Sequence, residues 1–432
     1  MLEEPIREFR DPIHGFIEVY PHEKAIIDTF PFQRLRRISQ LGLTSRIYHG
    51  AEHSRFGHSL GVMHLAGKAT KELIRKHGDL IRSAAGWTQG KHDQESERLV
   101  LIARLAGLLH DVGHPPFSHT GEKSLFEGKL RHEDYSAAVI ENTEIGHIID
   151  EELKGKRISK TDVVALLRDH VVPAGCVFLH QLLDSAYDVD KMDYLLRDSH
   201  YCGVEYGTFD LSRLIATLTL REEEDDELIL AGRDDGCNAL EALVIARYFM
   251  FTQVYFHGVR RAYDLILTAF IQELLQDEYE SPHYPSTENV TEYLRWDDSR
   301  VLTAAAGRSN AQTKNFAWMI THRRHPKVAY ETLPHPDAEV AKKAFRRLLP
   351  EVKAKFQGVR IWRDMATDHP QQYKQEDIPI KRVRDDPPTW NSFVNISKVL
   401  QGLQDIGQVR LYAFADREVL GEIHESCRQV MA

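Results

Sequence analysis

Cysteine is scarce in this sequence, whose 432 residues contain only Cys176, Cys202, Cys237 and Cys427. None of them belongs to a CxxC pair, which disfavours both a disulfide framework and a zinc site built from thiolates. We therefore expect four reduced thiols with structural roles.

Long hydrophobic runs are also missing. The longest apolar stretches, such as LVLIARLAGLL, are interrupted by Arg104 well before they reach membrane-spanning length. The N-terminal segment MLEEPIREFRDPIHG is acidic and polar, whereas a signal peptide needs a basic start and an apolar middle. The sequence therefore predicts a cytoplasmic protein that has no membrane-spanning helix.

The sequence also lacks an excess of positive charge. The chain has 55 lysines and arginines against 65 acidic residues, a formal net charge of −10. This balance disfavours nucleic acid as a partner, because a nucleic-acid-coating surface is basic. A phosphate-bearing substrate would have to be met by a few well-placed cations.

Helix-period patterns dominate the chain and predict a mainly α fold with short β hairpins. The hairpins are expected in DPIHGFIEVYP and in LIATLTLREEEDDELILAGRDDG. A polar region from Gln276 to Asn289 suggests a boundary between a core at 1–275 and a smaller α+β appendage at 276–432. The strand-like PIKRVR and VRLYAFA and a terminal helix from Asp416 would build this appendage, with a role in assembly or regulation.

The sequence contains 23 histidines, and those between His49 and His132 are crowded, most densely in LLHDVGHPPFSH. This stretch places His110 and Asp111 at the C-terminal end of an apolar helix. An imidazole and a carboxylate at one point suit Mn, Fe or Zn. An isolated His-Asp dipeptide, however, is more often a solvated pair or a helix cap than a metal site.

Two distant segments strengthen the metal interpretation. His58 opens an amphipathic helix in HSRFGHSLGV, and Asp190 lies in DVDKMDYLLRD. With His110 and Asp111 they would give two nitrogen and two oxygen ligands and leave open positions on a six-coordinate ion. Open positions are typical of a catalytic rather than a structural metal.

The order of these residues resembles the HD phosphohydrolase superfamily. Six blocks resemble, in sequence order over about residues 6–270, its deoxynucleoside triphosphate triphosphohydrolase (dNTPase) branch: DPIHGFIEVYP, IIDTFPFQRLRRISQLG, HSRFGHSLGVMHLAG, LAGLLHDVGHPPFSHTGE, HEDYSAAVI and DVDKMDYLLRDSHYCGV. This branch includes the animal SAM-and-HD-domain dNTPases and bacterial dGTPases, although no SAM domain is expected here. The resemblance implies an HD-domain helical core that hydrolyses a dNTP to deoxynucleoside and tripolyphosphate, with Mg accompanying the triphosphate.

The resemblance also implies roles for individual side chains. His132 would be the acid-base residue, Glu122 its support and His114 a phosphate-facing helper. The implied substrate-binding residues are Arg55 and Lys191 at the phosphates, Tyr194 against the deoxyribose, Gln40 and Asp198 at the 3′-hydroxyl, Tyr263 beside the base, and His119. The competing interpretation is structural: His114 and His119 could make helix-end hydrogen bonds, and His132 could simply open the next helix.

An activating nucleotide site is a further implication of the resemblance. Counterparts of residues that bind a guanine nucleotide or dNTP effector between subunits are Arg7, Asp28, Gln33 and Arg36. The expected assembly is a homo-oligomer, a dimer or a tetramer. The last three residues could instead cap and salt-bridge two short helices.

Two other functions fit the same residues. One is a phosphodiesterase or nuclease that uses the same ion on nucleic acid or a cyclic nucleotide, for which the acidic charge is unfavourable. The other is a catalytically silent nucleotide sensor that oligomerises, against which the complete ligand set and His132 argue.

Overall fold

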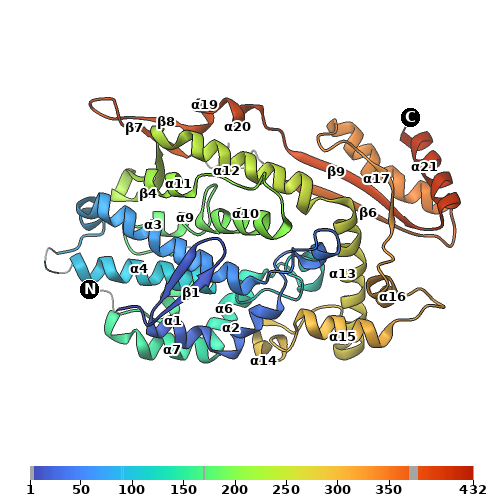
Figure 1. The fold of residues 1–432 in the computed structure, drawn as a ribbon, viewed down its shortest axis with the longest axis horizontal. Coiled ribbons are helices and arrows are strands. Elements are labelled where there is room, and N and C mark those ends of the chain that lie inside the picture. The colour runs from blue at the N-terminus through green and yellow to red at the C-terminus, as the bar shows by residue number, and fades with distance from the viewer. Residues whose placement is uncertain (1–3, 89, 91, 169–170, 369–377, 432) are drawn as a thin grey trace.

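The computed structural model describes residues 4–88, 90, 92–168, 171–368 and 378–431, and 58% of the chain is helical (Figure 1). The predicted mainly α fold is confirmed. Among the described residues, no helix combines the length and the hydrophobicity that crossing a bilayer requires.

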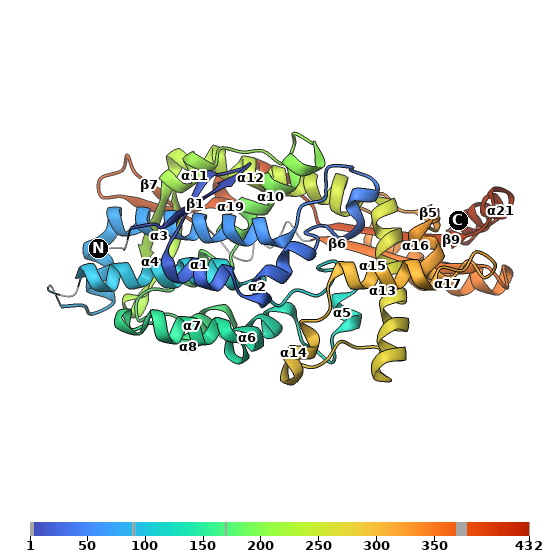
Figure 2. The same cartoon turned by 60° about the horizontal axis from the view of Figure 1, so that its bottom comes forward.

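Two long helices that lie side by side form the centre of the larger part of the molecule (Figure 2). These are α3 (Arg55–Ala84) and α4 (His92–Leu109), and the residues from Leu99 to Leu109 are almost all buried. Gly107 lets the helices approach closely: a Cβ there would meet backbone atoms of Val62 and Met63 at 3.0 to 3.1 Å.

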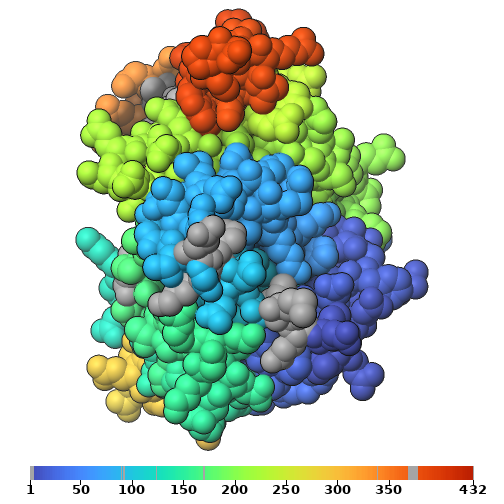
Figure 3. All heavy atoms as spheres, turned by 90° about the vertical axis from the view of Figure 1, so that its left-hand side faces the viewer, coloured from blue at the N-terminus to red at the C-terminus, as the bar shows by residue number. Residues whose placement is uncertain are grey.

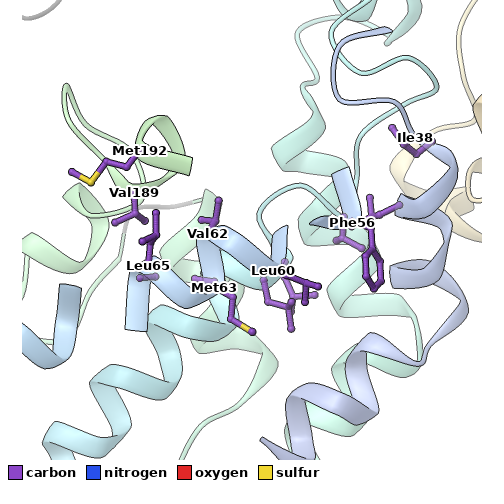
Figure 4. Close-up of a cluster of buried hydrophobic side chains, with 14 of the residues drawn as sticks. Ile38, Phe56, Leu60, Val62, Met63, Leu65, Val189 and Met192 are labelled. Atoms are coloured by element: carbon purple, nitrogen blue, oxygen red, sulfur yellow. The ribbon is translucent and has the colours of Figure 1, made fainter. Parts of the chain in front are cut away.

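Shorter helices surround this pair. Along the chain they are α1 (Pro21–Ile27), α2 (Phe30–Arg34), α5 (Glu122–Leu125), α6 (His132–Asn142), α7 (Glu144–Glu152), α8 (Lys160–Arg168), α9 (Phe178–Gln181), α10 (Val189–Cys202) and α11 (Leu211–Thr217). Short 3-10 segments lie between elements along the chain, at Leu35–Arg37, Gly42–Arg46, Lys154–Lys156, Glu224–Asp226, Asp234–Gly236 and Thr287–Asn289. α10 packs against α3, and Val189 and Met192 belong to the same buried cluster as Val62 and Leu65 (Figure 4).

Both predicted hairpins are confirmed. The first pairs β1 (Arg7–Asp11) with β2 (Gly15–Val19). The second pairs β3 (Leu218–Glu222) with β4 (Leu228–Arg233), and β7 (Pro379–Arg382) and β8 (Thr389–Ser392) extend it to a four-stranded sheet in which β4 and β7 run parallel. In Figure 3 the orange-red segment with β7 and β8 tops the face above α3 and α4.

The rest of the chain continues with helices and then forms a small α+β unit. The helices are α12 (Cys237–Phe249), a π-helix at Met250–Tyr255, α13 (Gly258–Tyr279), α14 (Val290–Tyr293), α15 (Asp298–Arg308), α16 (Phe316–Thr321), α19 (Phe393–Ile396) and α20 (Lys398–Gly402). The α+β unit consists of β5 (Lys327–Glu331), β9 (Ile406–Phe414), β6 (Arg360–Asp368), α17 (Ala338–Lys355) and α21 (Arg417–Met431). The two helices cover the three-stranded sheet around a second hydrophobic core (Figure 1).

The main core includes residues on both sides of position 275. Leu274 and Leu275 belong to it, and so do Tyr284, Tyr293 and Trp296. The division into a core at 1–275 and an appendage at 276–432 stays a prediction.

Candidate functional site

Three elements bring the predicted metal ligands together. His110 and Asp111 directly follow the last turn of α4, His58 lies in the first turn of α3, and Asp190 lies in the first turn of α10. The N-terminus of α10 is fixed by Asp188, whose carboxylate accepts the backbone N–H of residue 191 at 2.7 Å. All three helix ends therefore point at one place.

The four side chains lie within a few ångström of each other. His58 Nε2 is 2.9 Å from Asp190 Oδ1 and 3.4 Å from Asp111 Oδ2. His110 Nε2 is 3.4 Å from the same Asp111 oxygen and 3.6 Å from Asp190 Oδ1. One ligand atom each of His58, His110 and Asp190 thus fits within 4.8 Å of the others.

The hydrogen bonds of the two imidazoles fit a divalent cation. His110 Nδ1 lies 2.9 Å from Gly107 O, which can only accept, so Nδ1 carries a proton and the Nε2 of the neutral ring presents a lone pair. This Nε2 is buried and makes no hydrogen bond within the described part of the chain. His58 Nδ1 likewise donates to Asp193 Oδ2 at 2.8 Å. Rings held in this way through their second nitrogen are typical of metal-binding histidines.

Electrostatics also favours a cation here. Burial opposes the charge of Asp111, but Arg55 and the neighbouring histidines outweigh it and hold the pKa of Asp111 well below its usual value. Burial also opposes the charge of His58, yet hydrogen bonds to Asp190 and Asp193 raise the pKa of His58 to about 10. The carboxylates around His58 therefore favour positive charge at this place.

A second cluster joins His114, His119, Glu122 and His132. Glu122 accepts hydrogen bonds from His132 Nδ1 at 2.9 Å and from His119 Nδ1 at 2.8 Å. Burial lowers the pKa of His132, but the hydrogen bond and charge of Glu122 outweigh it, so this pKa is raised overall. His114 stacks on His132 with 3.8 Å between ring centroids, and burial, then Arg55, hold the pKa of His114 well below its usual value. One histidine of the stack thus favours the charged form and the other the neutral form.

Both clusters line a single cavity of about 1000 Å³. All the predicted metal ligands, catalytic residues and substrate-binding residues line it except Tyr263, which is fully buried and has its ring 5.3 Å from that of His325. The predicted contact of Tyr263 with a base stays a prediction.

The residues that were predicted to bind the phosphates and the sugar make hydrogen bonds or ion pairs within the protein. Arg55 donates to Asp111 and, at 2.7 Å, to Ser118 Oγ, and Lys191 Nζ is 2.6 Å from Asp188.

Asp198 accepts from His53 at 2.8 Å and from Tyr255 at 2.7 Å. Its carboxylate is therefore held in a fixed orientation.

Family comparisons agree with this architecture. The HD domain matches residues 55–198, and the HD associated region matches residues 209–431. The chain belongs to the HD-domain family. The predicted HD resemblance is confirmed.

Several relatives of this HD-domain protein are known. The uncharacterized protein YwfO of Bacillus subtilis is 35% identical over 310 residues, which cover 68% of this chain and 64% of YwfO. The uncharacterized protein MJ1154 of Methanocaldococcus jannaschii is 33% identical over 270 residues, 62% of this chain and 50% of that protein. Deoxynucleoside triphosphate triphosphohydrolase SAMHD1 of Homo sapiens is 32% identical over 293 residues, 62% of this chain and 44% of SAMHD1. These matches span less than two thirds of each relative.

A solved structure matches nearly the whole chain. It is the crystal structure of a hypothetical protein from Aquifex aeolicus, 30% identical, with a TM-score of 0.74 over 97% of this chain and 99% of that one. The similarity therefore extends through the C-terminal α+β unit.

The predicted effector residues of the HD-domain protein lie outside the cavity. Arg7, Asp28 and Arg36 are exposed. Gln33 donates to Ile27 O at 2.7 Å and accepts from Arg36 Nε at 2.8 Å, and Asp28 pairs with a lysine one turn earlier in α1. Such local contacts fit the alternative that these residues stabilise two short helices. The effector role stays a prediction.

The sequence did not indicate several residues of the cavity wall. Tyr255 comes from the π-helix, whose hydrogen bonding departs from the helical period, and π-helical turns are frequent at functional sites. Met365, Ala366 and Thr367 come from β6, far beyond the HD motif blocks in the sequence. No spacing rule connects these positions with the HD dipeptide.

Proposed function

We propose that this HD-domain protein is a metal-dependent dNTP triphosphohydrolase, which cleaves a dNTP to deoxynucleoside and tripolyphosphate by attack of water on the α-phosphorus. The observation that carries the proposal is the convergence of two imidazole Nε2 atoms and the carboxylates of Asp111 and Asp190 in a cavity that also contains the His132–Glu122 pair. The similarity to SAMHD1, named a deoxynucleoside triphosphate triphosphohydrolase, supports the choice of substrate.

His58, His110, Asp111 and Asp190 would hold the divalent cation, which we propose to be Mn, Fe, Zn or Mg. When bound, this ion lowers the pKa of water and draws charge from phosphoryl oxygens. His110 Nε2, which is buried without a hydrogen bond among the described residues, would gain a partner in this ion.

The leaving 5′ oxygen departs as an alkoxide and needs a proton. His132 can supply it from Nε2, because Nδ1 is bonded to Glu122 and the Glu122 charge favours the protonated ring. His114, neutral and stacked on His132, can donate a hydrogen bond to a phosphate without adding charge.

We propose that the remaining predicted residues bind different parts of the dNTP. Arg55 and Lys191 would meet the phosphates together with Mg, and His119 lies at the exposed side of the same cluster. Tyr194 and Asp198 follow Asp190 at one and two turns of α10, so the three lie along one face of the helix. This spacing would place a deoxyribose between the phosphates and Asp198, with Gln40 as a further partner.

The test is a product assay on the full chain. Each dNTP, alone and in a mixture of all four, is incubated with Mn²⁺ or Mg²⁺, and deoxynucleoside and tripolyphosphate are separated chromatographically. We expect both products from the wild type, none from the double variant His110→Ala/Asp111→Ala, and wild-type rates from His147→Ala, which removes an exposed histidine on α7. Absence of both products from every dNTP, alone and in the mixture, would overturn the proposal.

The same assay separates the alternatives. Cleavage of an internal phosphodiester without dNTP hydrolysis would indicate a nuclease or phosphodiesterase, and metal binding without any product would indicate a silent sensor.

We also propose activation by a guanine nucleotide or dNTP at Arg7, Asp28, Gln33 and Arg36 in a homo-oligomer. Activity in the dNTP mixture that single dNTPs do not give, lost in Arg36→Ala, would support it. Equal activity with and without the other nucleotides would contradict it.

A further inference from the structure

One buried carboxylate, that of Asp193, connects the N-terminal hairpin to the candidate metal site. Asp193 Oδ2 accepts from His58 Nδ1 and from Arg197 Nε, both at 2.8 Å. Asp193 Oδ1 accepts from His14 Nε2 at 2.6 Å and from a second Arg197 nitrogen at 2.8 Å. Four donor nitrogens from three side chains thus surround two oxygens, and neither these side chains nor that of Asp193 is more than 3% exposed.

Two glycines on helix α3 leave room for this carboxylate and its arginine partner. Gly61 lies three residues after His58, and a Cβ there would lie 1.8 Å from Asp193 Oδ1, which is not sterically possible. Gly57 in the preceding turn similarly faces Arg197 at 3.3 Å. The two glycines let α10 bring Asp193 beside His58, at the same α3–α10 contact that the cluster in Figure 4 fills with apolar side chains.

The turn of the β1–β2 hairpin is tied to the same place. Asp11 Oδ1 accepts the backbone N–H groups of Ile13 and His14 at 2.9 and 3.0 Å, which fixes the turn. Asp11 Oδ2 accepts from Arg197 at 2.9 Å. The hairpin therefore contributes two side chains, Asp11 and His14, to the surroundings of Asp193.

We propose that Asp193, held by Arg197 and His14, is a positioning residue that fixes the ring of His58 with its Nε2 lone pair toward the cation, so that the N-terminal hairpin sets the metal affinity of the site. The inference rests on the proposed function, because it requires a divalent cation at His58. None of these three residues touches the substrate cavity among the described residues. Their effect is exerted through the orientation of one ligand.

Calorimetric titration of the metal-free full chain with Mn²⁺ tests the inference. In Asp193→Asn an amide NH₂ replaces one acceptor, so a donor must face a donor and His58 loses its fixed orientation. We expect the Kd for Mn²⁺ to rise roughly 10- to 100-fold. His14→Ala should raise it less, and His14→Gln, which keeps a donor toward Asp193, should restore most of the affinity.

Glu23→Gln is the matched control. Glu23 is fully buried and forms a bidentate pair with Arg104 at 2.6 and 2.8 Å, but it contacts none of the candidate ligands. We expect this variant to lower the melting temperature of the metal-free protein while the Kd for Mn²⁺ stays at the wild-type value.

The outcomes are distinguishable. If Asp193→Asn and His14→Ala bind Mn²⁺ with the wild-type Kd, or lose affinity no more than Glu23→Gln does, the positioning role is wrong. Should Asp193→Asn fail to fold, the comparison of His14→Ala with His14→Gln decides. If His58→Ala binds Mn²⁺ as the wild type does, the metal site itself, and with it the proposed function, is wrong.

Discussion

Glu122 holds His132 through a single oxygen: Oε1 lies 2.9 Å from both the backbone nitrogen and Nδ1 of His132. The first bond fixes the N-terminus of α6 and the second fixes the ring of its first residue. The acid-base candidate is therefore positioned by the same carboxylate that raises its pKa.

Replacement of this carboxylate should slow hydrolysis more than it weakens binding. Glu122→Gln keeps the size of the side chain but removes its charge, so His132 is less often protonated when the leaving oxygen needs a proton. We expect kcat for dNTP hydrolysis to fall about 100-fold with little change in KM. Steady-state kinetics beside Glu127→Gln, an exposed carboxylate nearby, provide the check, and a changed KM at constant kcat would contradict the assignment.

Tyr255 should affect the part of the cavity that we propose to bind the sugar. Its hydroxyl donates to Asp198 at 2.7 Å, and Tyr255→Phe would leave that buried carboxylate with one donor fewer. Because hydrogen bonds to charged groups are worth roughly 1.5 to 3 kcal/mol, we expect KM for dNTPs to rise about 10-fold or more. Tyr248→Phe, which loses a hydrogen bond of 2.8 Å to His335 outside the cavity, should leave KM unchanged; equal effects of the two variants would refute a role for Tyr255.

The four metal ligands predicted from the sequence lie close together in the structure, whereas several residues around them were not predicted. His58, His110, Asp111 and Asp190 each lie at a helix end, and helix ends can be recognised from periodicity and breakers. The residues that orient them are harder to recognise. Asp193 and Arg197, one turn apart on α10, look like an ordinary surface ion pair until the packing of α10 on α3 buries them.

Long-range packing also explains why some residues that line the cavity were not predicted from the sequence. Tyr255 lies in a π-helix and β6 belongs to a separate sheet, so neither has a local pattern that leads to the site. Tyr263, which the resemblance assigned to the base, is fully buried on α13, and its contact with a base stays a prediction.

Asp298 should make stability depend on pH. Burial raises the pKa of Asp298 to about 6, although Ser39 and the backbone N–H of Phe117, at 2.7 Å, donate to it. Between about pH 4 and pH 6 the folded chain then binds more protons at this group than the unfolded chain, so its contribution is greatest below pH 4 and is lost as the pH rises through 6. The free energy of unfolding of the wild type relative to Asp298→Asn should fall by up to about 3 kcal/mol over this range. Denaturant titrations at several pH values measure this free energy. If the difference between the wild type and Asp298→Asn does not change with pH, the pKa of Asp298 is not raised.

Gly107 should be essential for the contact between α3 and α4. A Cβ at this position would lie 3.0 to 3.1 Å from backbone atoms of Val62 and Met63, which cannot rotate away as a side chain can. Gly107→Ala should therefore lower the free energy of unfolding by about 1 to 3 kcal/mol, although alanine is the better helix former. Gly421 on α21 is the matched position, because a Cβ there would have no neighbour within 4 Å, and Gly421→Ala should stabilise by about 0.4 to 1 kcal/mol. Since His110 directly follows α4, the strained variant should also shift the HD dipeptide and weaken Mn²⁺ binding, whereas stabilisation by both substitutions would show that the helices are not in such close contact.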